Sequence, residues 1–133
     1  MKKYILLIYF IFSIFIIFII YNSNQKVNYN ILYGKWIGKQ NNKIISLTFN
    51  QDQTCEFVIH QDRIKIKGNF EIDFSKNPIP LSIKNISNLD HALHTIISFK
   101  NNNELRIGNF GKRWKSRPIA FDYNKNLILK KEN

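Results

Sequence analysis

The residues that most readily do chemistry in this chain are three histidines, one cysteine and a basic cluster. His91 and His94 stand three apart behind Asp90, a spacing that on a helix would place both imidazoles on one side, where they suit a metal ion. In an extended segment the same odd spacing sends them to opposite faces, and the apolar alternation that begins at Leu93 favours a strand. We therefore expect Asp90 and His91 in a turn, His94 on the outside of a strand, and no metal ion or cofactor.

The single cysteine excludes an internal disulfide. Cys55 shares its alternation with Phe57 and Ile59, so we expect a buried thiol that packs as a small apolar side chain; a catalytic or intermolecular thiol is the alternative. His60 lies on the polar face of the same segment and is expected at the surface. The chain has no Gly-x-Ser-x-Gly elbow, phosphate-binding glycine loop, His-Glu-x-x-His or Cys-x-x-Cys, and we expect no enzymatic activity.

Basic residues give the chain a formal net charge of +11. They concentrate around Trp114, in Lys112, Arg113 and Lys115. Cations beside an aromatic ring suit nucleic acid, anionic lipid headgroups or acidic polymers of a cell envelope. The alternative is a solvated basic loop with Trp114 tucked into the end of the domain.

The N-terminal run from Tyr4 to Tyr21 is apolar or aromatic except for Ser13, and Lys2 and Lys3 precede it. As a helix it would reach roughly 27 Å, close to the ~30 Å hydrocarbon core of a bilayer. We expect a retained transmembrane anchor that contacts membrane lipid. The exit from the run lacks the small residues of a cleavage site, but a cleaved signal and a buried helix stay as alternatives.

This anchor predicts two parts, residues 1–26 as anchor and linker and residues 27–133 as one small domain. A short charged N-terminus ahead of a long apolar run favours a cytoplasmic N-terminus and a domain outside the cytoplasm. Secretion after signal cleavage is the alternative. A domain outside the cytoplasm argues against nucleic acid and leaves an anionic lipid or envelope polymer as the partner of the basic cluster.

In the domain, apolar and polar residues alternate with a period of two. From Arg63 to Phe74, apolar residues and Gly68 alternate with charged or polar ones, which predicts a half-buried antiparallel strand with a bulge or bend at Gly68. Turn-rich points such as Asn41-Asn42 separate further predicted strands: 31–39, 43–50, 54–60, 79–85, 93–100, 104–110, 118–123 and 127–131. We expect an all-β fold, a small antiparallel up-and-down barrel whose closure removes exposed edges.

The sequence Leu32-Tyr33-Gly34-Lys35-Trp36 carries the Gly-x-Trp of lipocalin-like, calycin-type barrels. With the motifs that follow in order, at residues 47–49, 67–73, 77–83, 104–107 and 117–121, it resembles the small lipocalin-like domain of bacterial envelope proteins. The resemblance implies a barrel closed at one end by Gly34 and Trp36, with a late arginine over the indole; Arg117 is the candidate, and Arg113 the second choice.

The resemblance carries no enzymatic residues. An eight-stranded barrel holds one small ligand or is filled by side chains. We expect a membrane-anchored binding or interaction module, either holding a small apolar ligand against Phe57, Phe70, Ile72 and Phe99 or engaging an anionic partner through the cluster at Trp114. The alternative is a fully packed structural barrel, a subunit of an envelope complex without its own ligand.

Overall fold

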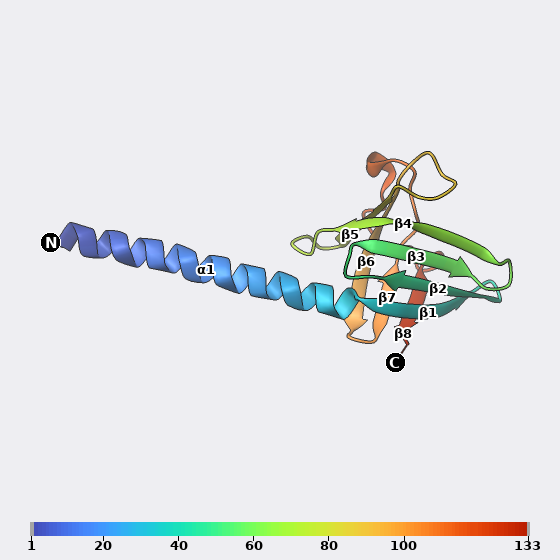
Figure 1. Ribbon diagram of the computed structural model, residues 1–133, viewed down its shortest axis with the longest axis horizontal. Helices are drawn as coiled ribbons and strands as arrows, with labels where there is room; N and C mark the ends of the chain where they lie inside the picture. Colours follow the sequence, from blue (N-terminus) through green and yellow to red (C-terminus); the bar gives the residue numbers. More distant parts are fainter. Residues whose placement is uncertain (1, 133) are drawn as a thin grey trace. The chain divides into compact units, whose positions relative to one another are not determined.

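The computed structural model describes the backbone of residues 2–132 and the side chains of residues 9–21 and 29–132. The chain divides into two compact units, Met1–Leu32 and Tyr33–Asn133. The first is a helix and the second an all-β barrel (Figure 1). Each unit is described by itself below.

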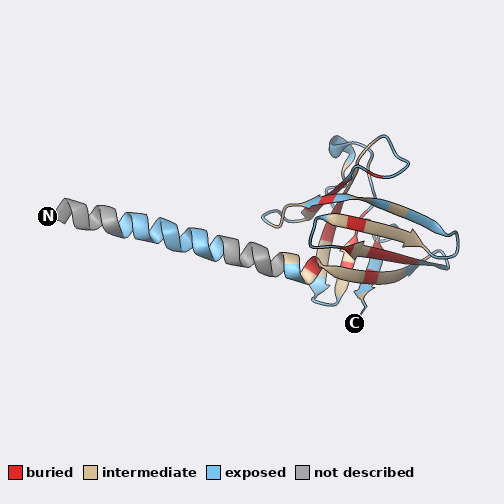
Figure 2. Ribbon diagram, in the orientation of Figure 1, coloured by how far each residue is buried: buried red, intermediate tan, exposed pale blue. Residues whose placement is uncertain are grey.

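The helix α1 spans Lys2–Leu32. It therefore continues through residues 22–26, where the sequence predicted a linker, past residue 27, where the domain was expected to begin, and through the start of the strand expected from Ile31. The helix side chains described between Tyr9 and Tyr21 are all exposed (Figure 2), and all are apolar or aromatic except Ser13, whose hydroxyl donates to the carbonyl of Phe10 at 2.8 Å.

Among the described residues, no helix combines the length and the apolar character needed to cross a membrane. The predicted transmembrane run also includes residues 4–8, whose side chains lie outside the described residues.

The second unit is a closed barrel in which each strand is antiparallel to its sequence neighbours, and β8 returns to pair with β1. This is the up-and-down topology expected from the sequence and is that of a small lipocalin-like barrel. Asn41 and Asn42, both at positive φ, form the two-residue turn between β1 and β2, as their type predicts. The strands are β1 Gly34–Gln40, β2 Lys43–Phe49, β3 Thr54–Ile59, β4 Ile64–Ile72, β5 Ile79–Lys84, β6 Leu93–Asn101, β7 Glu104–Ile107 and β8 Leu127–Lys131.

The strand registers place one apolar set toward the axis. The alternation predicted for β4 holds, because Ile66 faces Phe57 of β3, and Phe70 faces Ile83 of β5. Following the registers around the barrel, the inward positions are apolar or glycine except for Thr95, Lys131 and the pair Gln40 and Lys43 beside the β1–β2 turn. Thr95 is fully buried and satisfies its hydroxyl by donating to the carbonyl of Gly108 at 2.8 Å.

Two expectations about strands were wrong. Residues 118–123 form no strand, because β7 and β8 pair directly and the closed sheet offers no edge to another strand. The pairing through Gly68 is continuous, and the irregular register lies between Phe99 and Asn101. Gly68 is instead a point of close approach, since a Cβ there would lie 2.8 Å from the carbonyl oxygen of Lys84.

Aromatic rings fill the part of the interior near the start of β1. Trp36 is completely buried, and its ring centroid lies 6.0 Å from that of Phe99, which stacks on Phe74 at 6.5 Å. Phe49 and Phe70 meet edge to face at 5.0 Å. These contacts are at the distances at which aromatic pairs attract, so this part of the barrel is a packed core.

Candidate functional site

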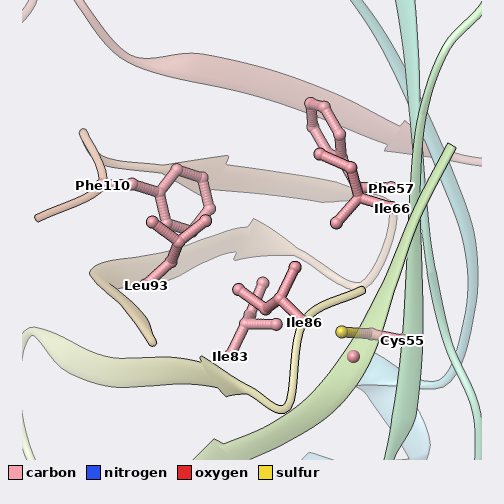
Figure 3. A pocket seen from close by; sticks show the side chains of 8 residues that line it. Cys55, Phe57, Ile66, Ile83, Ile86, Leu93 and Phe110 are labelled. Atoms are coloured by element: carbon pink, nitrogen blue, oxygen red, sulfur yellow. The ribbon is translucent and has the colours of Figure 1, made fainter. Parts of the chain in front are cut away.

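An apolar cavity of about 100 Å³ lies in another part of the barrel, bounded by β3 to β6. Its walls come from the four strands β3 to β6 and from two loops, and Figure 3 shows the side chains that line it. The loop residues are Ile86, after β5, and Phe110, after β7. Every residue that lines it is apolar or glycine: Cys55, Phe57, Ile66, Gly68, Ile83, Ile86, Leu93 and Phe110.

The lining includes one exposed residue, Phe110, which is 37% exposed. Phe110 and Leu93 lie together on one side, facing Phe57 and Ile66 across the space, with Ile83 and Ile86 between the two pairs (Figure 3). A lining of this kind attracts apolar groups and gives water no hydrogen-bond partner.

The thiol of Cys55 is the one titratable group in this lining. Burial raises its pKa to about 11, because the charged thiolate is disfavoured away from water. The thiol is therefore protonated at neutral pH and packs as a small apolar group, as the sequence predicted.

Of the four residues proposed to hold a ligand, one lines this cavity and three lie elsewhere. Phe57 lines the cavity, whereas Phe70 packs against Phe49 and Phe99 against Trp36. Ile72 faces inward beside Leu81 and is half-buried. The remaining lining residues were missed. The alternation could have placed Ile83 and Leu93 inside, but Ile86 and Phe110 belong to loops, where no periodicity indicates direction.

The cation over the Trp36 ring is Lys131, with its Nζ 5.3 Å from the ring centroid, instead of the expected Arg117. Lys131 is the register partner of Trp36 on β8 and shares its face of the sheet. Gly34, at a φ of 116°, leaves room for the lysine chain, because a Cβ there would lie 3.2 Å from the Lys131 Cε. Burial lowers the pKa of Lys131.

Arg117 lies on the outer wall, where it joins Ser82 and His94. Its Nη2 donates to the Ser82 Oγ at 2.6 Å and lies 3.3 Å from the His94 Nδ1, which is 2.9 Å from the same hydroxyl. Burial, then the positive charges of Arg117 and Lys84, lower the pKa of His94, against an opposing effect of Glu71. The Nδ1 of a neutral imidazole accepts a hydrogen bond from the Ser82 hydroxyl, which in turn accepts one from Arg117. These contacts fasten the chain after β7 to the wall.

The chain between β7 and β8, residues 108–126, is here called the β7–β8 loop. It carries the predicted basic cluster and the one-turn helix η1, Trp114–Ser116. Trp114 is 68% exposed rather than tucked into the barrel, and the Lys115 Nζ lies 5.5 Å from its ring. Lys112 and Arg113 are also exposed.

His91 and His94 do not point toward a common site. His94 faces outward beside Ser82, while His91 lies before the strand and its Nδ1 is 2.8 Å from the Asp90 carboxylate. Within the described part of the chain, no group of three or more histidine, cysteine or acidic residues is placed to hold a metal ion.

Comparison of the chain with protein-family models, curated proteins and solved structures finds no match.

Proposed function

We propose that the protein is a membrane-tethered, non-enzymatic barrel of lipocalin-like type that holds a small apolar ligand between β3 and β6. The observation that carries this proposal is the cavity of about 100 Å³ with a wholly apolar lining. Protein interiors are packed with few voids larger than a water molecule, so a space of this size in a small barrel requires an explanation.

The size of the cavity limits the ligand. At ~24 cal/mol per Å³ of unfilled space, an enclosed void of this volume costs about 2 kcal/mol; because this space is partly open, a ligand that fills it recovers at most that amount. An affinity of 1 mM requires about 4 kcal/mol, so the cavity alone holds a ligand weakly. It fits an atom or group smaller than benzene, which a cavity of ~150 Å³ accepts. The suitable ligands are compact apolar molecules and the short alkyl ends of longer ones.

Tethering rests on α1. Its exposed side chains between Tyr9 and Tyr21 form an apolar surface around the helix, and such a surface is unfavourable in water. A bilayer would cover it, and we place the barrel outside the cytoplasm, in the envelope of a bacterium. Separation of membranes from soluble material, followed by protease treatment of intact cells, tests the tether and its orientation.

Xenon is the probe that tests the cavity. We expect xenon pressure to shift the methyl NMR signals of Ile83, Ile86 and Leu93 in the full chain, and to leave the methyls of Leu47 unchanged. Ile66→Phe should fill the space and abolish the shifts. Ile64→Phe, two residues along the same strand and outside the lining, is the control and should preserve them. Unchanged cavity methyls in the wild type would refute the proposal.

A fully packed structural barrel is the second candidate, and the aromatic contacts near Trp36 favour it. If that reading holds, relaxation of side chains closes the cavity in solution. Ile66→Phe would then destabilise the barrel by 1 to 3 kcal/mol, about the usual cost of overpacking. A ligand-holding barrel should instead tolerate this substitution, because the added ring occupies space that is already present.

A further inference from the structure

The β7–β8 loop displays large apolar side chains that the barrel does not cover. Ile119 is 90% exposed, Tyr123 89% and Trp114 68%. Scattered exposed residues are ordinary on protein surfaces, but these three belong to one loop of nineteen residues, 108–126, and the exposed cavity-lining residue Phe110 belongs to it as well.

The same loop carries an excess of positive charge. It contains Lys112, Arg113, Lys115, Arg117 and Lys125, against one acidic residue, Asp122. Asp122 and Lys125 form an ion pair at 3.9 Å, and Asp90, in the loop between β5 and β6, interacts with Lys112. Among the described side chains, no carboxylate forms an ion pair with Arg113 or Lys115.

The barrel holds this loop in place. Gly111 exchanges two backbone hydrogen bonds with His94, at 2.7 and 2.8 Å, and Arg117 donates to Ser82. The Ser116 hydroxyl bonds to both the amide and the carbonyl of Arg113, closing η1. Further along, the Arg106 guanidinium lies 5.6 Å from the centroid of the Phe121 ring. The exposed side chains therefore project from a fastened loop, so binding through them costs little ordering entropy.

From these observations we propose that the β7–β8 loop docks on the surface of an anionic lipid bilayer. Lys112, Arg113 and Lys115 meet the headgroups, Trp114 and Tyr123 lie at the interface with water, where such rings concentrate, and Ile119 enters the acyl region. A bilayer accounts for both features of the loop. A nucleic acid or an acidic polymer would use the cations and stack on the rings but would leave Ile119 in water.

This proposal is independent of α1 and of the cavity. The loop follows β7 and precedes β8, so it lies at the end of the barrel opposite Gly34 and Lys131. Because α1 could hold the chain on a vesicle by itself, the test must report on the loop. Trp114 provides that signal, since Trp36 is completely buried and its emission is constant; Trp114→Phe measures the constant part.

The experiment places the full chain on vesicles with brominated acyl chains, either phosphatidylcholine alone or with phosphatidylglycerol, at low salt. We expect quenching of Trp114 on the anionic vesicles and its loss at high salt, where surface charges are screened. Each cation near the surface contributes about fivefold. Replacing Lys112, Arg113 and Lys115 by Gln should therefore lower the ratio of docked to undocked loop about a hundredfold.

The matched control replaces three exposed cations elsewhere on the barrel, Lys39, Lys100 and Lys130, by Gln and should leave the quenching unchanged. Ile119→Ser should reduce it at unchanged charge. The proposal is overturned if quenching is equal on both kinds of vesicle, if the two triple variants behave alike, or if polyphosphate in solution displaces the loop while Ile119→Ser has no effect.

Discussion

Replacing Trp36 by alanine tests how the barrel is closed. The side chain is completely buried, faces Leu47 across β1 and β2, and lies against Phe99 and Lys131. Removal of such a ring loses its transfer free energy and leaves a cavity, which together cost about 3 to 5 kcal/mol for Trp→Ala in a core. A barrel of this size has only about 5 to 15 kcal/mol of stability, so the variant should be close to unfolding.

The assay is urea unfolding of the full chain, followed through backbone amide NMR signals of β2 and β8, because α1 would dominate the circular dichroism. Ile128→Ala is the control. Ile128 is on β8 beside the same region, but it is 47% exposed and faces outward, so the change should cost less than about 1 kcal/mol. A loss below 1 kcal/mol for Trp36→Ala would refute its role in closure.

Lys131→Met separates the charge from the packing. A cation over an aromatic ring contributes about 0.5 to 1 kcal/mol at a partly exposed site, but burial of the ammonium, which lowers the pKa of Lys131, offsets part of that gain. We expect Lys131→Met alone to change stability by less than 1 kcal/mol. A double-mutant cycle with Trp36→Leu, which removes the aromatic ring, should give a coupling of about 0.5 kcal/mol, and a coupling of zero would show that the ring and the ammonium act independently.

Three other predictions concern single residues. The pKa of His94 is lower in the folded chain than its ordinary value of 6.5, so the unfolded chain binds the proton more readily. The free energy of unfolding should therefore be highest above pH 6.5 and fall as the pH drops through the folded pKa. In urea titrations at several pH values, His94→Gln should flatten this dependence. Gly38→Ala should cost 1 to 3 kcal/mol, because its Cβ would lie 2.3 Å from the backbone oxygen of Ile128; Gly108→Ala, which meets side chains at 3.0 Å or more, should cost less in the same assay. Cys55, with a pKa of about 11, should react with iodoacetamide at pH 8 far more slowly in the folded chain than in urea, and equal rates would contradict its burial.

The barrel was predictable because its interior repeats one simple rule. Inward residues of β4 alternate with charged ones, and polar turns such as Asn41-Asn42 separate the strands, so the all-β class and the antiparallel order follow from local pattern. Residues 118–123 misled the prediction because Ile119, Phe121 and Tyr123 also alternate. Their alternation has no sheet to join, since β7 and β8 already close the barrel.

The candidate sites were less predictable, because each depends on how distant segments meet. Arg117 was expected over Trp36, but it lies in a loop on the outer wall. Lys131 lies over the Trp36 ring instead, because the register of β8 pairs these two residues. The basic cluster was visible in the sequence. The exposure of Ile119 and Tyr123 was not, since exposure depends on the absence of a covering element.

Backbone geometry explains why the cavity forms where it does. Gly68 cannot carry a side chain, because a Cβ there would lie 2.8 Å from the carbonyl of Lys84 and 2.9 Å from the Ile83 Cγ2. Its register partner on β3 is Cys55, a small residue, so neither member of this pair fills the interior. In the packed part of the barrel the corresponding space is taken by aromatic rings. Because the approach of β5 keeps residue 68 without a side chain, a larger side chain in place of Cys55 is the remaining way for this pair to fill the space, and it would favour a packed barrel over one that holds a ligand.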